Sequence, residues 1–424
     1  MRLLGLLIID SERRSVGDKQ IMNKEQVFFL QFISDYLHGK ETAPPDDIDW
    51  GIILRYAREQ ELEGLVYYQC KNYLEKQQDE PKAQNLRYVY NSLKQSYSKT
   101  VFHYVRMTAA FQDLKKSFQS NGIPFLTVKG LLVGSLYPVP ELRTMGDLDI
   151  ITTSEDRHRA RSVLESLGYD VETGIMEWRA RRDIVLIELH DCLHYAENGY
   201  RAELFNSFFS NCDQEEEYCY KLKEEYHFVF LIDHLRKHFD YHGVGFRQFM
   251  DIAVFAQKAS DLDWAWIQAV LENLELLKFT KTVFAMIREW WDVEMPAPII
   301  SAELDQTFIE QSTELIIKNG VFGFKNDDHW KYALSGSVRS IHAPALLKPV
   351  VRGIREVCKP YEVMIKYPYC SFAINRKYLL PAAWGRRLIY LMRNKKKESL
   401  KAIRSMYDTK HMEDHMDLKR QWGL

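Results

Sequence analysis

A pair of aspartates directly in front of a β-branched run is the feature that most constrains the fold. Asp147 and Asp149 flank Leu148 and lead into the Ile-Ile-Thr-Thr run at 150–153, a composition typical of a strand. Side chains two apart in a strand share one face at roughly 6.5–7 Å separation. Two carboxylates so placed are able to hold a pair of Mg²⁺ ions about 3.5–4 Å apart, as in metal-bound phosphoryl transfer.

Asp-x-Asp occurs twice more, in a different context. Asp47 and Asp49 precede apolar residues at helical spacing, as do Asp261 and Asp263. Such aspartates are typical helix caps, because a carboxylate accepts hydrogen bonds from the free N–H groups of the first turn. The pair at 147 and 149 is the one that predicts a metal site on a strand.

Length and composition narrow the class of protein. A chain of 424 residues with 46% hydrophobic and 13% aromatic residues predicts two or more packed domains. The formal net charge of −2 argues against general binding to nucleic acid and leaves room for a local basic groove. The six cysteines form no C-x-x-C pair, which disfavours a thiolate zinc site or a disulfide framework and indicates a reduced, cytoplasmic environment.

Changes in periodicity divide the chain into five regions. Residues 1–21 hold a short apolar run ended by charges and are expected to be a dispensable extension; no segment of the sequence is long enough to span a bilayer. The remaining regions are a helical N-terminal region at 22–118, with helices at 25–37, 49–59, 64–74 and 84–119, an α/β core at 119–215, a helical domain at 216–345 and a basic helical region at 346–424.

The α/β core supplies a third carboxylate. Strands are expected at 125–128, 149–153 and 184–190, and helices at 130–137 and 156–167. Alternation along the last strand puts Glu188 on one face with Ile184, Leu186 and His190. Glu188 is therefore the candidate that completes a metal site. A solvent-exposed strand face that carries Glu188 and His190 is the alternative.

Two cations are placed to meet a triphosphate. Lys129 ends the first strand and Gly130 opens the next helix, which combines a point charge with backbone N–H donors. Arg143, four residues before Asp147, offers a bidentate grip on phosphate oxygens. Each is equally compatible with an ordinary surface cation.

These segments together resemble the uncharacterised nucleotidyltransferase family of the DNA polymerase β superfamily. The matching positions are Val128-Lys129-Gly130, Tyr137-Pro138, Arg143, Gly146-Asp147-Leu148-Asp149-Ile150-Ile151, Gly168-Tyr169 and Ile187-Glu188-Leu189-His190. Weaker likeness continues at 234–238, 243–253, 367–368 and 379–387, so the resemblance covers nearly the whole chain from about residue 25.

The resemblance implies an α+β fold, with a polymerase β-like core of a small mixed sheet and helices, flanked by mostly helical regions. It implies two Mg²⁺ ions held by Asp147, Asp149 and Glu188, and transfer of a nucleoside monophosphate from an NTP, ATP first, to an acceptor hydroxyl. The glycine-serine element of the superfamily has two candidates. Gly134-Ser135 has the right distance to Asp147, whereas the family likeness favours Lys129-Gly130, where Leu131 replaces the serine.

Residues downstream of the core border the expected nucleotide cleft. His234, His238 and His242 follow one helix face, where at most two of them suit a single zinc ion and a row of histidines facing phosphate or an interface is the alternative. Arg247 and Asp251 have the spacing of a helix salt bridge, and the resemblance lets them line the cleft with His190.

The C-terminal region concentrates positive charge. Its basic residues are Arg386, Arg387, Arg393, Lys395, Lys396, Lys397, Lys401 and Arg404, with an apolar run at 388–392 among them. A basic amphipathic helix is able to contact an anionic partner such as RNA, a membrane surface or an acidic protein, and a solvated face on a packed helix is the plain alternative.

Three functions stay open on the sequence. The first is an active nucleotidyltransferase whose acceptor is a small molecule, a protein or an RNA. The second is a catalytically silent nucleotide-binding or scaffold protein of the same fold, and the third is a metal-dependent phosphohydrolase. The intact Asp147, Asp149 and Glu188 favour the first.

Overall fold

The computed structural model describes residues 22–77, 84–174, 177–193, 199–206, 208–241, 244–258, 262–296, 299, 302–321, 354, 357–365, 367–394 and 417–424. By its internal contacts the chain divides into two compact units. The first comprises residues 1–235, 244–321 and 422–424, and the second comprises residues 236–243 and 322–421. The finer division into five regions stays a prediction.

The first unit begins with four helices at the positions that the sequence predicts. They are α2 (Lys24–Leu37), α3 (Trp50–Gln60), α4 (Glu63–Lys76) and α5 (Gln84–Ser120). Asp49 caps α3, because its side chain accepts hydrogen bonds from the N–H groups of Gly51 and Ile52. Asp263 caps α11 (Trp264–Asn273) through the N–H of Trp266, while Asp261 lies outside the described residues.

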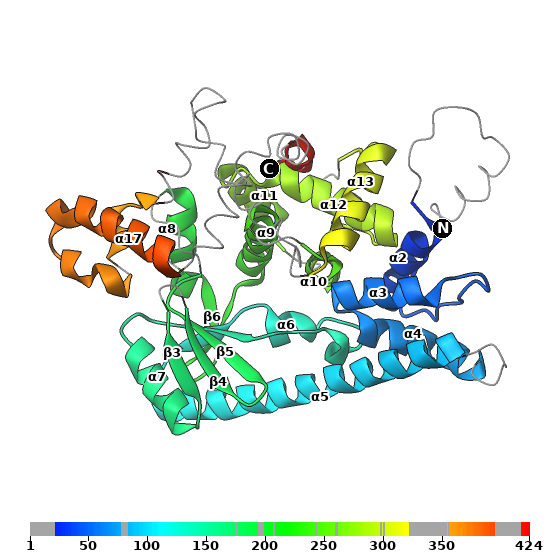
Figure 1. Ribbon diagram of the computed structural model, residues 1–424, viewed down its shortest axis with the longest axis horizontal. Coiled ribbons are helices and arrows are strands. Elements are labelled where there is room, and N and C mark those ends of the chain that lie inside the picture. The colour runs from blue at the N-terminus through cyan, green and yellow to red at the C-terminus, as the bar shows by residue number, and fades with distance from the viewer. Residues whose placement is uncertain are drawn as a thin grey trace. The chain divides into compact units, whose positions relative to one another are not determined.

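A seven-stranded mixed sheet follows (Figure 1). Its strands are β1 (Phe125–Thr127), β2 (Leu148–Thr152), β3 (Asp170–Thr173), β4 (Trp178–Arg182), β5 (Val185–His190), β6 (Cys212–Glu216) and β7 (Cys219–Leu222). They lie in the order β3-β4-β5-β2-β1-β7-β6. The central strand β2 is parallel to β5 and antiparallel to β1. The observed fold is therefore the expected α+β class.

Four strands of the sheet are not predicted from the sequence, because charged residues on one face obscure the strand pattern. The sequence predicts β1, β2 and β5, whereas β3, β4, β6 and β7 are found only in the structure. In β4 only Trp178 and Ala180 are buried, and Arg179 and Arg181 at the alternate positions are exposed. A short strand with arginines at alternate positions lacks the β-branched composition by which strands are recognised.

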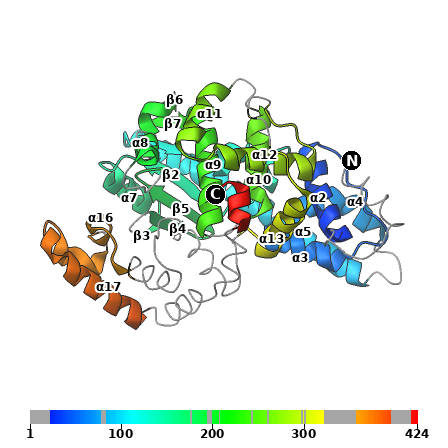
Figure 2. The same ribbon diagram turned by 90° about the horizontal axis from the view of Figure 1, so that it is seen from above.

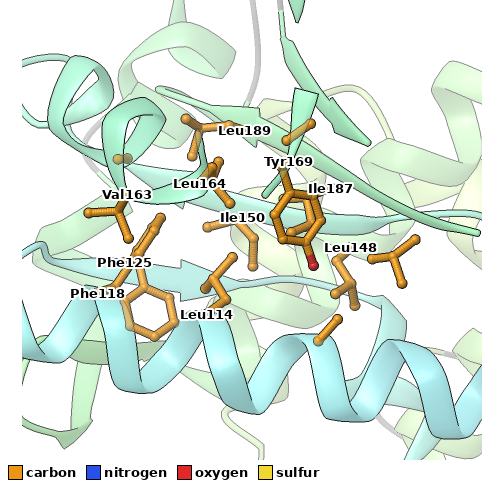
Figure 3. Packing of buried hydrophobic residues seen from close by; sticks show 14 of the residues in the cluster. Leu114, Phe118, Phe125, Leu148, Ile150, Val163, Leu164, Tyr169, Ile187 and Leu189 are labelled. Atoms are coloured by element: carbon orange, nitrogen blue, oxygen red, sulfur yellow. The ribbon is translucent and has the colours of Figure 1, made fainter. Parts of the chain in front are cut away.

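The hydrophobic core lies on one face of the sheet, under α5 and α7 (Arg157–Ser166). Figure 3 shows the α5 side chains Leu114 and Phe118 and the α7 side chains Val163 and Leu164 converging on the strands. Phe118 meets Phe125 of β1 edge to face, with ring centroids 5.4 Å apart. The strand residues in this core are Phe125, Leu148, Ile150, Val171, Trp178, Ala180, Val185, Ile187, Leu189 and Cys219.

This packing decides where the acidic residues lie. Leu148 and Ile150 face the core, so Asp149 between them faces the opposite side. Ile187 and Leu189 likewise face the core and turn Glu188 and His190 away from it. The face opposite α5 is therefore the polar face of the sheet.

Shorter elements and further helices complete the first unit. They are α6 (Gly130–Gly134), η3 (Pro140–Leu142), α8 (Tyr200–Asn206), η4 (Phe208–Asn211), α9 (Glu224–Tyr241) up to residue 235, α10 (Phe246–Lys258), α12 (Leu277–Trp291) and α13 (Gln306–Asn319). Figure 1 shows α10, α12 and α13 on the side of the sheet away from α5, and Figure 2 looks down on them. Trp422 is buried against Phe249 and Phe308, so the C-terminal residues pack in the first unit.

The second unit contains the predicted basic helix. α17 (Leu380–Asn394) follows α16 (Tyr361–Met364), η6 (Pro368–Ala373) and η7 (Lys377–Leu379). Arg386 is exposed, whereas Arg387 is buried with its guanidinium 4.5 Å from the ring centroid of Tyr367. Arg387 therefore packs inside the unit and does not belong to a solvated face. The basic positions Lys395, Lys396, Lys397, Lys401 and Arg404 lie outside the described residues.

Within the part of the chain that the structure describes, no helix combines the length and the apolar character needed to cross a membrane.

Candidate active site

Two carboxylates face each other on the polar face of the sheet. β2 and β5 are parallel neighbours, and their register places Asp149 directly beside Glu188. Asp149 is only 9% exposed and Glu188 is half-buried. His190 follows two residues after Glu188 on the same face. The structure thus brings together three of the residues that the sequence singles out.

Asp149 is held from two sides. The ammonium nitrogen Nζ of Lys129 lies 2.8 Å from its Oδ2, and Nε2 of His190 lies 3.2 Å from its Oδ1. Burial alone would raise the pKa of Asp149, but the positive charge of Lys129 and the hydrogen bond with His190 outweigh burial and lower that pKa. Asp149 is therefore ionised throughout the physiological range.

Glu188 has a similar arrangement at its two oxygens. The guanidinium of Arg179 on β4 donates from Nε to Oε1 at 3.1 Å, and Nε2 of His190 lies 3.8 Å from Oε2. Burial, with further contributions from Asp147 and Asp149, raises the pKa of Glu188. Arg179 also donates to Glu177 at 2.9 Å, so it bridges two acidic side chains.

Asp147 precedes β2 and differs from Asp149 in its electrostatics. Its pKa is raised, first by burial and then by the neighbouring negative charge of Asp149. Lys129 and Arg247 lower it to a smaller extent. A cation bound beside Asp147 would offset the repulsion from Asp149 and would therefore favour the ionised form of Asp147.

Three of these side chains have the geometry of a metal site. One ligand atom each of Asp149, Glu188 and His190 lies within 4.8 Å of the other two. Two carboxylate oxygens and an imidazole nitrogen form a donor set that fits a divalent cation. The trio contains His190 and not Asp147, whereas the expected set was Asp147, Asp149 and Glu188.

Lys129 adopts a backbone conformation that side chains rarely take. Its φ of 56° and ψ of −131° lie in a region suited to glycine. The backbone N–H of Lys129 points to Nε2 of His227 on α9 at 3.4 Å. His227 is buried, and its burial lowers its pKa to about 4, so the neutral ring can accept this bond. The strained backbone conformation thus occurs at the residue whose ammonium group contacts Asp149.

The two candidates for the glycine element lie at opposite ends of α6. Gly130 opens the helix directly after Lys129, and a side chain added at Gly130 would meet no atom within 4 Å. Ser135 lies beyond the other end, where its hydroxyl donates to the carbonyl of Leu132 at 2.6 Å. A methyl group at Gly134 would lie 3.5 Å from the Arg143 side chain. The contact with Asp149 therefore belongs to the Lys129-Gly130 element.

Arg143 has a buried partner. Its Nε and one terminal nitrogen donate to the two carboxylate oxygens of Asp251 at 2.8 and 2.7 Å. The hydroxyl of Tyr137 donates to the same carboxylate at 2.6 Å. The proposed contact between Arg143 and a triphosphate would require this bidentate pair on α10 to open.

The expected salt bridge between Arg247 and Asp251 is wrong. Asp251 pairs with Arg143, and Arg247 instead donates to the carbonyl and the hydroxyl of Thr144 at 2.8 and 3.1 Å. Arg247 also lies 3.4 Å from Glu61. Asp251 already accepts hydrogen bonds from Arg143 and Tyr137, and the N–H groups of Arg247 are satisfied by the loop before Asp147. Arg247 thereby holds the loop that leads into Asp147.

The histidine row lies on α9. His234 stacks on Phe230, with ring centroids 6.0 Å apart. His238 is on the same helix, and His242 lies outside the described residues. Among the described residues, neither His234 nor His238 belongs to a group of three metal-ligating side chains.

Sequence reasoning missed Arg179, His227 and the role of Tyr137. Arg179 was hidden because β4 was not predicted, although the register of β4 and β5 puts it opposite Glu188. His227 carries no local motif, since it reaches Lys129 from a helix 98 positions downstream. Only the three-dimensional fold supplies these contacts.

A mixed sheet that carries Asp149 and Glu188 on neighbouring strands, with Asp147 just before β2 and a lysine at Asp149, has the arrangement of a nucleotidyltransferase core. The chain belongs to the uncharacterised nucleotidyltransferase family, whose model matches residues 46–292. The match covers more than half of the chain, from just before α3 to the end of α12, and includes the whole sheet. No curated protein and no solved structure matches the chain.

Proposed function

We propose that the protein transfers a nucleoside monophosphate from an NTP, ATP first, to an acceptor hydroxyl, with Mg²⁺ held by Asp147, Asp149 and Glu188. The observation that carries the proposal is the pairing of Asp149 with Glu188 across β2 and β5, with Lys129 at 2.8 Å from Asp149. Carboxylates that converge beside a lysine suit a metal-bound polyphosphate. The acceptor is a small molecule, a protein or an RNA.

In the proposed reaction the acceptor oxygen attacks the α-phosphorus in line with the bond to the β-phosphate. The new oxygen–phosphorus bond forms as that bond breaks, pyrophosphate leaves, and the acceptor proton passes to solvent. Mg²⁺ at the site, two ions in the expected scheme, supplies charge neutralisation for the phosphates and polarisation of the acceptor oxygen. The ammonium group of Lys129 holds Oδ2 of Asp149 and has further N–H groups that could bind phosphate oxygens.

The residues around the site keep it in shape. Arg247 fixes Thr144, three residues before Asp147, and Arg179 fixes one oxygen of Glu188. Both restrain a carboxylate that would otherwise reorient under its neighbours' repulsion. Their contribution is to positioning, since neither is required to touch the nucleotide.

One observation favours the second candidate, a catalytically silent nucleotide-binding or scaffold protein. Leu131 stands where the superfamily has a serine, and the hydroxyl of Ser135, in the other candidate element, donates to a backbone carbonyl. A missing hydroxyl contact weakens the grip on phosphate by the worth of one charge-assisted hydrogen bond, about 1.5–3 kcal/mol. The silent alternative therefore predicts weak binding and no turnover.

Labelled ATP separates the candidates. Purified protein is incubated with Mg²⁺, small-molecule, protein and RNA acceptors, and ATP that carries label at either the α- or the γ-phosphate. Transfer predicts that α-label enters an acceptor while γ-label leaves as pyrophosphate. Release of γ-label as inorganic phosphate would instead indicate a phosphohydrolase, and no change in either label over the whole panel would support the silent protein.

A matched pair of variants controls the assay. Asp149→Asn keeps the volume of the side chain but removes the charge, and is expected to abolish transfer. Asp213→Asn makes the same change on β6 at the edge of the sheet, where the side chain is exposed, and should leave transfer unchanged. Equal activity of both variants would contradict the proposal.

A further inference from the structure

The carboxylates of Asp149 and Glu188 each present one oxygen to a cation and the other to His190. Lys129 binds Oδ2 of Asp149 at 2.8 Å, and Arg179 binds Oε1 of Glu188 at 3.1 Å. The remaining oxygens, Oδ1 and Oε2, lie 3.2 and 3.8 Å from Nε2 of His190. The two cations thus occupy the outer oxygens, and the inner oxygens converge on the imidazole nitrogen.

We propose that Nε2 of His190, Oδ1 of Asp149 and Oε2 of Glu188 are the protein ligands of one divalent ion, and that this mixed set selects Mn²⁺ over Mg²⁺. The inference deepens the proposed function, because it concerns the same site, but it assigns to His190 a role as ligand and to the ion a different identity. Mg²⁺ favours carboxylates, phosphates and water. Mn²⁺ takes the same oxygen ligands, and as a first-row transition ion it accepts an imidazole nitrogen more readily than Mg²⁺ does.

The spacing of the three atoms agrees with a common ion. Ligands at about 2.1 Å from a metal and at right angles to each other lie roughly 3 Å apart, and wider angles give larger separations. The 3.2 and 3.8 Å distances from Nε2 lie in this range. A small movement of side chains therefore suffices to close the set around an ion.

The strands fix this geometry. His190 is paired in register with Ile151, two residue pairs beyond Asp149 and Glu188, so the imidazole is carried by the same two central strands as the carboxylates. Sites on strands are held more accurately than sites on loops.

Lys129 and Arg179 orient the carboxylates by holding the oxygens that the ion does not use. The ion takes the lone pair of Nε2, so the neutral imidazole carries its single proton on Nδ1 when the ion is bound.

The test is pulsed electron paramagnetic resonance on the full-length protein loaded with Mn²⁺. A histidine nitrogen bound to Mn²⁺ gives a ¹⁴N modulation that oxygen ligands do not give. We expect this modulation in the wild-type protein and its loss in His190→Gln. His158→Gln is the matched control, because His158 lies on α7, exposed and packed on Trp178, outside the site.

Mn²⁺ affinity gives a second readout. His190→Gln should weaken Mn²⁺ binding at least about tenfold while Mg²⁺ binding changes little. Circular dichroism melting of both variants verifies that the fold is retained. In the wild-type protein, Mg²⁺ should displace Mn²⁺ only when it is in large excess, and displacement at equal concentration would overturn the selectivity.

The outcomes separate the inference from the function on which it rests. Bound Mn²⁺ without ¹⁴N modulation, displaced by Mg²⁺ and dependent on Asp149, would overturn the role of His190 and leave the proposed transfer intact. No bound Mn²⁺ while Mg²⁺ still binds would overturn the inference alone, and no binding of either ion, with or without a non-hydrolysable ATP analogue, would overturn both.

Discussion

At the scale of single residues, the site is a balance of buried charges. Lys129 and His190 keep Asp149 ionised, whereas burial and neighbouring carboxylates raise the pKa values of Asp147 and Glu188. Electrostatic repulsion among buried carboxylates is expected at a site that binds a cation. Lys129 adds conformational strain to this electrostatic strain through its positive φ.

The strain at Lys129 predicts a difference between two variants that both lack the ammonium group. Lys129→Gly relieves the backbone, whereas Lys129→Gln keeps the strain, so the glycine variant should be more stable by about 1–2 kcal/mol. Urea unfolding of the two proteins measures the difference. Equal stabilities, or a more stable glutamine variant, would show that the conformation at residue 129 carries no cost.

The raised pKa of Glu188 predicts a stabilising substitution. The folded protein keeps a proton on Glu188 to a higher pH than the unfolded chain, so the ionised carboxylate destabilises the metal-free fold. Glu188→Gln should therefore raise stability at pH 7, and the gain should shrink as the pH falls through the raised pKa. Denaturation at pH 7 and pH 4 tests this, with Glu172→Gln on the exposed side of β3 as control. A gain that is independent of pH would contradict the electrostatic origin.

At the scale of elements, a helix far away in the sequence, α10, holds the segment that connects β1 to β2. Arg143 and Tyr137, on either side of η3, both bind Asp251 of α10, and Arg247 of the same helix binds Thr144. The segment between β1 and β2 is therefore fixed from outside the sheet. This explains how a chain segment with little secondary structure delivers Asp147 to the site.

The buried pair of Arg143 and Asp251 predicts strong coupling. Removing one partner leaves an uncompensated buried charge, so Arg143→Met or Asp251→Asn should each cost about 3–5 kcal/mol. The double variant should cost less than the sum, because neither charge remains unpaired. Chemical denaturation of the four proteins gives the coupling energy. Strict additivity would contradict the pairing.

The elements show which parts of the fold the sequence predicts. The helices α2 to α5 follow from apolar periodicity with a clear cap such as Asp49, and β2 and β5 follow from β-branched runs. β4 was missed because its exposed arginines mask a strand of which every second residue is buried. Local sequence patterns predict local conformation, and they fail where pairing with a neighbouring strand determines whether a segment forms a strand.

The same division holds for the site. Asp149, Glu188 and Lys129 were predicted as site residues, and the structure brings them together. The partner of Arg143 was not predicted, because Asp251 lies 108 positions away. Pairing over such distances depends on how the helices pack, which no motif at either position records.

At the scale of the whole molecule, the hydrophobic core and the candidate site lie on opposite faces of the sheet and do not depend on each other. The core lies under α5 and α7, and the acidic residues lie on the opposite face of the sheet. The protein should therefore fold without metal and become more stable with it. A ligand at 100 times its Kd adds about 2.7 kcal/mol to the stability of the state that binds it.

This separation predicts the effect of metal on unfolding. Mn²⁺ or Mg²⁺ should raise the melting temperature, and the rise should grow with the logarithm of the metal concentration above Kd; chelation should return it to the metal-free value without unfolding the protein. The Asp147→Asn, Asp149→Asn double variant should show no such rise. An equal rise in that variant would place the ion elsewhere.

The most direct test of the account is isothermal titration of the four NTPs, as non-hydrolysable α,β-analogues, into the purified protein with divalent metal. We predict metal-dependent binding that is lost in the Asp147→Asn, Asp149→Asn double variant and kept in Asp213→Asn. The nucleotide that binds best identifies the base. Absence of binding by every nucleotide, or equal binding by the double variant, would contradict the assignment of these aspartates to a nucleotidyl-transfer site.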